Sequence, residues 1–280
     1  MAAIYDCTVP AELLAGMRLS RAAISRGELV VIPTDTVYGV AADAFTPAAV
    51  QRLLDAKGRT RQSPPPVLIP NLATLDALAE SVSEPVRALA EAFWPGGLTI
   101  VVPARSSLLW DLGDTDGTVA LRMPADPLAL ELLAETGPLA VSSANLTGQP
   151  AALNAAEAER MLGDSVSVYL QAAPPTTPPT GLASTIIDAT DDEHITIIRH
   201  GVVTEQQLRA LVGDALFDPK RAEPADDAPP ADAAALPADD AALPADDAAV
   251  RADGAVVPAD AAAVPAADPT ARPADAAEPA

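Results

Sequence analysis

A short basic run at residues 57–61 carries the clearest chemical signal in the sequence. It reads Lys-Gly-Arg-Thr-Arg and follows residues 47–56, whose apolar spacing predicts a helix. Lys57 is the one lysine before Lys220, whereas twelve arginines occupy the same span. A compact ammonium beside planar guanidinium groups suits a polyphosphate, because the ammonium acts as a point charge and the guanidinium groups bind in a bidentate way. The alternative is a solvated helix end, where cations are also favourable.

Two polar segments follow apolar stretches that have the composition of buried strands. Residues 33–39 read Pro-Thr-Asp-Thr-Val-Tyr-Gly and follow an apolar run, and residues 142–145 read Ser-Ser-Ala-Asn and follow another. Open α/β sheets bind ligands at strand ends, so both segments are candidates for a polar ligand cradle. A turn in which threonine and aspartate side chains cap backbone groups explains 33–39 equally well.

A nucleophilic serine is not indicated by these segments. Ser142 and Ser143 lack the Gly-x-Ser-x-Gly setting of a nucleophile elbow, and His194 and His200 stand in no recognisable triad context. The sequence also contains no Cys/His cluster, Walker loop or Rossmann glycine pattern. The common zinc, P-loop and dinucleotide sites are therefore excluded.

Arg122 ends an apolar segment, 119–122, that has the pattern of a strand. A guanidinium at such a place must pair with an anion or reach solvent. Two kinds of anion fit equally well: a carboxylate or phosphate of a bound ligand, and a nearby carboxylate of the protein.

These residues must be positioned by an alternation of helices and strands. The apolar spacing predicts helices at 11–25, 47–56, 72–79, 86–93, 128–135, 155–162 and 205–212. Short apolar runs predict strands at 29–32, 67–69, 98–102, 119–122, 139–141, 166–170, 185–187 and 195–198. This order is typical of a single α/β domain, built on a twisted, mixed sheet with helices packed on it.

Composition divides the chain into a domain at 1–217 and a tail at 218–280. The tail holds 26 Ala, 11 Pro, 12 Asp and 2 Glu among 63 residues, and it has no aromatic residue. We expect it to be disordered, because it cannot bury enough apolar area to offset its chain entropy. Four basic and 14 acidic residues give the tail a charge of −10, which leaves −12 of the total −22 to the domain. Such acidity argues against a protein that follows a nucleic-acid backbone.

The cellular setting is also constrained by the sequence. Cys7 is the single cysteine, so no internal disulfide can form and a reducing compartment is favoured. No apolar run approaches the length of about 20 residues that a membrane helix needs. We therefore expect a cytoplasmic protein that does not bind membranes.

Seven segments, in matching order and spacing across residues 10–214, resemble the YrdC-type L-threonylcarbamoyladenylate synthases. They are Pro-Thr-Asp-Thr-Val-Tyr-Gly at 33–39, Ala-Lys-Gly-Arg at 56–59, Phe-Trp-Pro-Gly at 93–96, Val-Ala-Leu-Arg-Met-Pro at 119–124, Ser-Ser-Ala-Asn at 142–145, Ala-Ser-Thr-Ile-Ile-Asp at 183–188 and Ile-Ile-Arg-His-Gly at 197–201. The resemblance implies a YrdC-like domain without the additional C-terminal domain of the longer members.

The resemblance also implies a reaction, in which L-threonine, bicarbonate and ATP give threonylcarbamoyl-AMP and pyrophosphate. The product would pass to the tRNA threonylcarbamoyl transferase machinery, with a weak tRNA contact as a further possibility. Mg²⁺ would accompany ATP, and no protein metal site or nucleophile is implied. By position, the ATP-binding residues would be Lys57, Arg59, Ser63, Thr118, Ser143, Asn145 and Arg199. The threonine-binding residues would be Thr36, Arg122 and Ser184.

The sequence departs from the family pattern after the basic run. Leu68 stands at the position expected for a histidine near threonine, and Ser63 at that of an amide or acid.

Two alternative functions remain open on the sequence alone. One is a non-catalytic nucleotide- or RNA-binding module of the same fold, with a basic patch at residues 57–61. The other is carbamoyl-adenylate chemistry on a different carrier, as in hydrogenase-maturation proteins, although the acylphosphatase and zinc-finger-like regions of those proteins are absent here.

Overall fold

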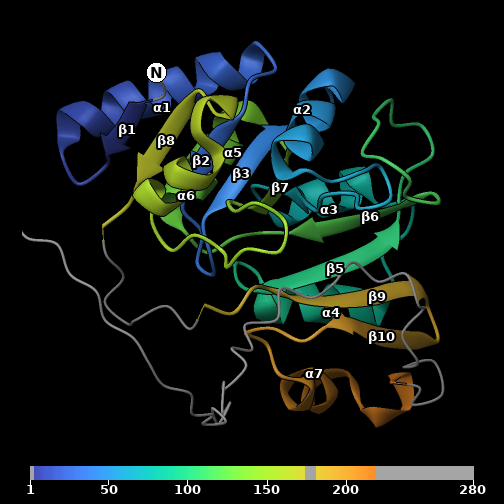
Figure 1. Ribbon diagram of the computed structural model, residues 1–280. Helices are drawn as coiled ribbons and strands as arrows, with labels where there is room; N and C mark the ends of the chain where they lie inside the picture. Colours follow the sequence, from blue (N-terminus) through green and yellow to red (C-terminus); the bar gives the residue numbers. More distant parts are fainter. Residues whose placement is uncertain (1–2, 174–180, 218–280) are drawn as a thin grey trace, which may run out of the picture. The chain divides into compact units, whose positions relative to one another are not determined.

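Helices and strands alternate along residues 3–173 and 181–217, which are the residues that the computed structural model describes (Figure 1). The helices are α1 (Pro10–Ser25), α2 (Pro47–Lys57), α3 (Leu72–Leu78), α4 (Glu84–Phe93), α5 (Pro127–Thr136), α6 (Ala155–Leu162) and α7 (Glu205–Val212). The strands are β1 (Ala3–Asp6), β2 (Val30–Ile32), β3 (Gly39–Asp43), β4 (Val67–Leu68), β5 (Leu98–Pro103), β6 (Thr118–Arg122), β7 (Leu139–Ser143), β8 (Val168–Gln171), β9 (Thr185–Asp191) and β10 (His194–Arg199).

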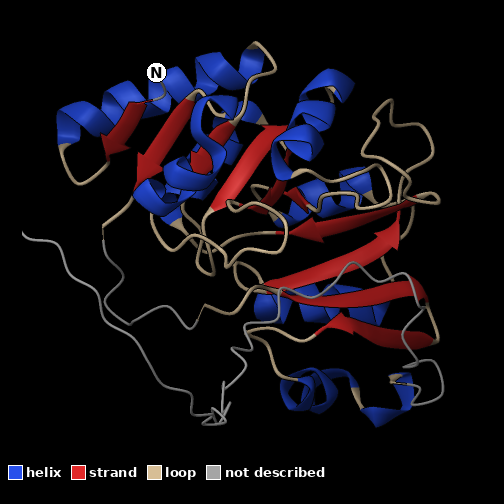
Figure 2. Ribbon diagram, in the orientation of Figure 1, coloured by secondary structure: helices blue, strands red, loops and turns tan. Residues whose placement is uncertain are grey.

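The strands form one mixed sheet in the order β1-β8-β2-β3-β7-β4-β6-β5-β9-β10. The sheet contains parallel pairs, such as β4 with β6 and β5 with β9, and antiparallel pairs, such as β3 with β7 and β5 with β6. Figure 2 shows the strands in red between blue helices. The predicted fold class, a mixed sheet with helices packed on it, is therefore confirmed.

All seven predicted helices are present, and proline occupies the first turn of α1, α2, α4 and α5. At this place in a helix, the missing N–H of proline costs no helical hydrogen bond. Two strands, β1 and β3, were not predicted. The sequence of β3 is Gly-Val-Ala-Ala-Asp, which has low intrinsic strand propensity, but its residues are paired on both sides, with β2 and with β7. Strand formation here follows from tertiary pairing and burial.

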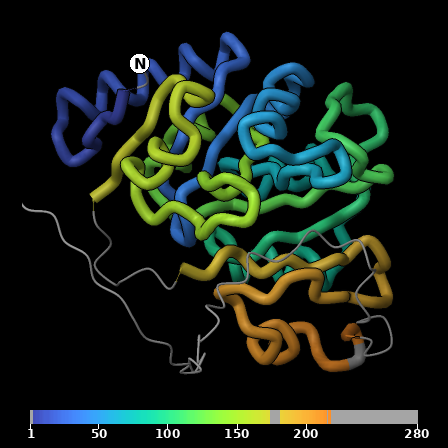
Figure 3. The backbone as a smooth tube through the Cα atoms, viewed as in Figure 1, coloured from blue at the N-terminus to red at the C-terminus, as the bar shows by residue number. Residues whose placement is uncertain are grey.

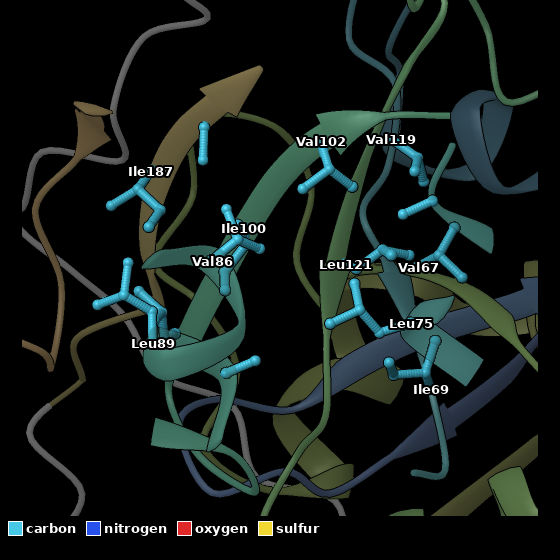
Figure 4. Packing of buried hydrophobic residues seen from close by; sticks show 14 of the residues in the cluster. Val67, Ile69, Leu75, Val86, Leu89, Ile100, Val102, Val119, Leu121 and Ile187 are labelled. Atoms are coloured by element: carbon cyan, nitrogen blue, oxygen red, sulfur yellow. The ribbon is translucent and has the colours of Figure 1, made fainter. Parts of the chain in front are cut away.

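Three apolar clusters fix the helices on the sheet. One joins α1 and α5 to strands of the N-terminal half, and a second joins α2 and α6 to the opposite face of that half. The third packs α3 and α4 on the half that contains β6, β5 and β9 (Figure 4). The chain path in Figure 3 shows that the orange C-terminal part lies beside the teal β5, although the two are far apart in sequence.

In the described part of the chain, one face of β6 and β5 is less covered than the other. Val119 and Leu121 are buried on the side of α3 and α4. Thr118 and Ala120, which alternate with them along β6, are half-buried on the other side. In β5 the same alternation leaves Val101 half-buried between fully covered neighbours. Because side chains alternate along a strand, this pattern defines an open face that also includes Arg122.

The remaining sequence lies outside the described residues. The chain divides into a unit Met1–Ala235 and a unit Leu236–Ala280. The predicted disordered tail, 218–280, falls wholly among the residues whose structure is not described.

Candidate functional site

Arg122 is the last residue of β6, and its side chain is buried at the end of the open face. The guanidinium donates hydrogen bonds from Nε to the carbonyl of Gly96 at 2.9 Å, from Nη1 to Oγ1 of Thr36 at 3.0 Å, and from Nη2 to Oδ1 of Asp35 at 2.8 Å. Burial lowers the pKa of Arg122 from its ordinary value, and the charge of Asp35 opposes this change. Within the described residues, these bonds use three of the five N–H groups of the guanidinium, so two are left for a ligand.

Asp35 is the carboxylate that the sequence left open as a partner of Arg122. Its Oδ1 also accepts the backbone N–H of Ala125 at 2.8 Å, which ties the loop before β3 to the chain after β6. Thr34 stabilises the same loop, because its hydroxyl donates to the carbonyl of Val37 at 2.6 Å. The 33–39 segment is thus both a capped turn and the support of a buried guanidinium. Asp35 was not among the predicted site residues, although it lies inside the segment that we singled out.

Ser184, the residue before β9, meets Arg199, the last residue of β10, beside the open face. Arg199 donates from Nη2 to the carbonyl of Ser184 at 2.8 Å and to its hydroxyl at 3.1 Å. The hydroxyl of Ser184 also lies 2.8 Å from Oγ1 of Thr99 on β5. A register shift between Ile197 and Arg199 marks a bulge in the edge strand β10. Such a bulge re-aims side chains, and here it lies where Arg199 reaches Ser184.

The Gly96-Gly97 turn joins these two groups of residues. The carbonyl of Gly96 accepts from Arg122, and the carbonyl of Gly97 accepts the backbone N–H of Thr185 at 2.9 Å. A Cβ at position 97 would lie 2.1 Å from Cγ2 of Val202 and 3.4 Å from Cγ2 of Thr36. Only glycine therefore fits at position 97, between the loop that contains Thr36 and the chain after β10.

Lys57 is buried at the end of α2, where it is 1% exposed. Its Nζ donates to the backbone carbonyls of Ser143 at 2.5 Å and Asn145 at 2.6 Å, and to Oδ1 of Asn145 at 2.8 Å. Gly58 ends the helix in the left-handed conformation, with φ of 64°, which an L side chain rarely adopts. The interpretation of Lys57 as a solvated helix end is therefore wrong.

The three cations of the basic run separate in the structure. Arg59 is half-buried and donates to the hydroxyls of Ser142 and Thr147, each at 3.3 Å. Arg61 is exposed, and its guanidinium lies 2.7 Å from a carboxylate oxygen of Asp111. Only Lys57 and Arg59 therefore contact residues 142–147, and the run does not form a continuous basic patch.

The pairing of β3 with β7 brings the two polar segments of the sequence together. Gly39, the last residue of the 33–39 segment, is paired with Ser143. A Cβ at position 39 would lie 2.6 Å from Cγ1 of Val141, so the close approach of the two strands requires glycine there. The cluster around Lys57 and the cluster around Arg122 are thus connected through one short loop.

Two predicted ATP residues are not drawn into these clusters by the described contacts. Ser63 lies in the turn before β4, and its backbone N–H donates to the carbonyl of Thr60 at 3.1 Å. Thr118 lies at the other end of β6 from Arg122, about 13 Å away for a strand rise of about 3.3 Å per residue. Its hydroxyl donates to the carbonyl of Thr115 at 2.8 Å. The assignments of both residues to ATP stay predictions.

Leu68 and Arg122 are neighbours across two paired strands. It lies opposite Arg122 in the parallel pairing of β4 with β6, and it is 3% exposed. Its side chain belongs to the apolar cluster that includes Ile32 and Leu139. The position expected for a histidine therefore carries a buried apolar side chain on the strand beside Arg122, and Thr36 and Asp35 provide polar contacts to the guanidinium.

The described residues contain neither a cluster of metal-ligating side chains nor a helix that could span a membrane. Between residues 3 and 217, apart from 174–180, no group of three or more His, Cys, Asp and Glu side chains is placed to hold a metal ion. No helix in this part of the chain has the length and apolar character needed to cross a membrane.

This chain is similar in sequence to known proteins of one family. The Sua5_yciO_yrdC family model, described as "Telomere recombination", matches residues 22–201. A Mycobacterium tuberculosis protein, provisionally named a threonylcarbamoyl-AMP synthase, is 46% identical over 76% of this chain and 96% of its own length. The threonylcarbamoyl-AMP synthase of Bacillus subtilis is 35% identical over 69% of this chain and 55% of its own length.

The fold of this chain is also similar to that of a solved structure. Pyrococcus abyssi Sua5 complexed with L-threonine superposes with a TM-score of 0.71 at 29% identity, covering 83% of this chain and 66% of that one. The family model covers more than half of this chain, and the M. tuberculosis relative is covered almost completely. The chain therefore belongs to the Sua5/YciO/YrdC family.

Proposed function

We propose that this protein is an L-threonylcarbamoyladenylate synthase, which makes threonylcarbamoyl-AMP and pyrophosphate from L-threonine, bicarbonate and ATP. The observation that carries the proposal is the buried Arg122, which retains two N–H donors beside Thr36 and lies one loop away from the cationic cluster of Lys57 and Arg59. An amino-acid carboxylate fits the first place and a triphosphate the second. The curated relatives named threonylcarbamoyl-AMP synthase support the same activity.

The reaction needs positioned charges and no nucleophilic side chain. The threonine amine adds to bicarbonate with loss of water, and a carbamate oxygen then attacks the α-phosphorus of ATP. The bond between the α- and β-phosphates breaks, and its electron pair leaves with pyrophosphate. Fixed cations and hydroxyls lower the barrier by aligning the two substrates and by neutralising the charge that develops on the phosphates.

The proposed roles follow the two clusters. Arg122 binds the threonine carboxylate, and Thr36 and Ser184 complete the threonine subsite. Lys57 and Arg59 provide positive charge at the phosphates, on a frame formed by Ser143 and Asn145. Further ATP contacts are assigned to Arg199, Ser63 and Thr118. Arg199 is well placed to couple the two substrates, because it donates to Ser184.

Mg²⁺ is proposed to arrive with ATP. Lys57, Arg59, Ser143 and Asn145 include no carboxylate, so this set suits phosphate oxygens better than a bare cation. Mg²⁺ commonly keeps several waters and binds through substrate phosphates, where it neutralises part of their charge. The product is proposed to pass to the tRNA threonylcarbamoyl transferase machinery, and this role places the activity in the cytoplasm.

The first expected result concerns the reaction itself. Purified protein should release pyrophosphate only when ATP, L-threonine and bicarbonate are all present, and label from bicarbonate should enter an adenylate. Chromatography of the product with labelled bicarbonate measures this directly. If ATP binds but no label enters an adenylate at any magnesium concentration, the synthase proposal fails and a nucleotide-binding module takes its place.

An RNA-binding module receives little support from the charges of the described residues. Lys57 is buried, Arg59 is half-buried and the exposed Arg61 is paired with Asp111, so the run 57–61 does not present a cluster of accessible cations. Any weak tRNA contact at this place is therefore proposed to depend on Arg59 and Arg61. Counterion-release binding needs several accessible cations, which this run does not present.

We also propose that the folded domain ends at residue 217. Phe217 is 5% exposed, packs in the cluster of α3 and α4, and lies 4.7 Å below the guanidinium carbon of Arg209. Truncation after Phe217 retains these contacts. We expect the truncated and full-length proteins to have the same melting temperature and turnover, measured side by side. A clear loss of either would show that residues beyond 217 contribute to the folded domain.

A further inference from the structure

A buried hydroxyl on β5 connects the proposed threonine subsite with Arg199. Thr99 is 1% exposed, and its Oγ1 lies 2.8 Å from the hydroxyl oxygen of Ser184, which is itself 5% exposed. Thr99 is paired with Ile186 of β9. On its other side, the antiparallel register of Ile100 with Leu121 places Thr99 next to Arg122. Thr99 therefore lies at the end of the open face where Arg122 is buried.

The direction of the hydrogen bond between Thr99 and Ser184 follows from their other partners. A guanidinium can only donate, so Nη2 of Arg199, at 3.1 Å, occupies one lone pair of the Ser184 hydroxyl. Among the described residues, the Ser184 hydroxyl is the hydrogen-bond partner of Oγ1 of Thr99. If Thr99 accepted from Ser184, its own proton would be buried without an acceptor. An unsatisfied buried donor is costly, so Thr99 donates to Ser184.

The Ser184 hydroxyl then has both lone pairs in use, and its O–H proton is what it presents to a ligand. We propose that Thr99 is a positioning residue, which fixes Ser184 as a hydrogen-bond donor toward an acceptor oxygen of L-threonine bound at Arg122. This inference rests on the proposed function, because it takes threonine as the ligand of Ser184. It adds a residue that no motif in the sequence indicated as part of the site.

Two substitutions separate the hydroxyl from the shape of the side chain. Thr99→Val keeps the volume and removes the donor, whereas Thr99→Ser keeps the donor. We expect Thr99→Val to weaken threonine binding about 3- to 10-fold, the effect of losing one hydrogen bond. Thr99→Ser should bind threonine almost as the wild type does. Calorimetry with threonine alone measures the affinity, and steady-state kinetics should place the change in the threonine KM while kcat and the ATP KM change much less.

A double-mutant cycle tests whether Thr99 acts through Ser184. In a Ser184→Ala background, Thr99→Val should cause no further loss of threonine affinity, because the mediating hydroxyl is already absent. Melting temperatures of all variants control for folding, and Thr99→Ala serves as the variant without a hydroxyl if Thr99→Val does not fold. Independent effects of the two substitutions, equal losses in Thr99→Ser and Thr99→Val, or unchanged affinity in Thr99→Val would each overturn the inference.

The same measurements distinguish this inference from the proposed function. A wild type that binds threonine but forms no labelled adenylate contradicts the synthase proposal, while the affinities of the Thr99 variants still decide the role of Thr99. A wild type that makes the adenylate and loses no threonine affinity in Thr99→Val contradicts the inference alone.

Discussion

Replacement of Arg122 by lysine is expected to raise the threonine KM about 10- to 100-fold, because hydrogen bonds to a charged group are each worth about 1.5 to 3 kcal/mol. An ammonium cannot reproduce a planar fork that donates to Gly96, Thr36 and Asp35 and still presents two N–H groups to a carboxylate. The ATP KM should change much less, since the residues proposed to bind the phosphates are Lys57 and Arg59. Steady-state kinetics with each substrate varied in turn measures both values.

Arg122→Ala should be more damaging than Arg122→Lys. It removes the charge as well as the fork, and it leaves the carboxylate of Asp35 with its backbone donor from Ala125 but without its cation. We therefore expect a lower melting temperature in addition to the loss of threonine use. A smaller threonine effect in Arg122→Ala than in Arg122→Lys would show that the site does not depend on the charge of this group.

The matched control for these variants is Arg87→Lys. Arg87 also pairs with a carboxylate, that of Asp76, but both side chains are well exposed and lie on α4 and α3. Exposed ion pairs contribute about 0 to 1 kcal/mol, so the substitution should change neither the KM nor the melting temperature noticeably. An unchanged threonine KM in Arg122→Lys, equal to that of this control, would remove Arg122 from the threonine subsite.

The sequence was sufficient to predict the helices and the class of the sheet, because both depend on local apolar patterns. It did not reveal β3, whose small residues become a strand through pairing with β2 and β7. Both polar segments directly follow apolar runs that have the composition of strands, so the sequence was sufficient to single them out together. Their connection through Gly39 and Ser143, however, depends on a strand that local patterns do not indicate.

The supporting residues of the site were the part that sequence reasoning missed. Asp35 and Arg122 are 87 positions apart, and Thr99 and Ser184 are 85 positions apart. A hydroxyl or carboxylate gains its role from the group placed opposite it in the fold, and spacing along the chain carries no information about that group. The identity of the charged residues was visible in the sequence, whereas the direction in which each is held was not.

The second large expected effect concerns Lys57, which is fully buried, whereas Arg59 is half-buried. Lys57→Ala should abolish measurable ATP use and also destabilise the fold. The substitution removes the ammonium that donates to the carbonyls of Ser143 and Asn145 and to the Oδ1 of Asn145, while the carbonyl of Ser143 keeps the backbone N–H of Asn145 at 2.9 Å. Each buried acceptor that loses its donor costs about 1 to 3 kcal/mol. A total near 3 kcal/mol would lower the melting temperature by about 6 to 12 °C for a domain of about 200 residues.

Arg59→Ala should separate the two effects. Its guanidinium is half-buried and makes contacts of 3.3 Å to two hydroxyls, which can bond to water when the side chain is removed. We expect the ATP KM of Arg59→Ala to rise about 10-fold or more, from the loss of a charge-assisted contact, with a melting temperature near that of the wild type. Thermal melting and ATP-dependent kinetics of the two alanine variants measure this separation.

Lys57→Met distinguishes the packing of the Lys57 stem from the donors at its end. Methionine fills much of the same space, so the apolar contacts along the end of α2 are largely retained while the ammonium is lost. If the oxygens around Nζ determine the stability, Lys57→Met should melt nearly as low as Lys57→Ala. Recovery of the wild-type melting temperature in Lys57→Met would mean that volume determines it. Recovery of ATP use as well would remove Lys57 from the phosphate subsite, because methionine carries no charge with which to hold a triphosphate.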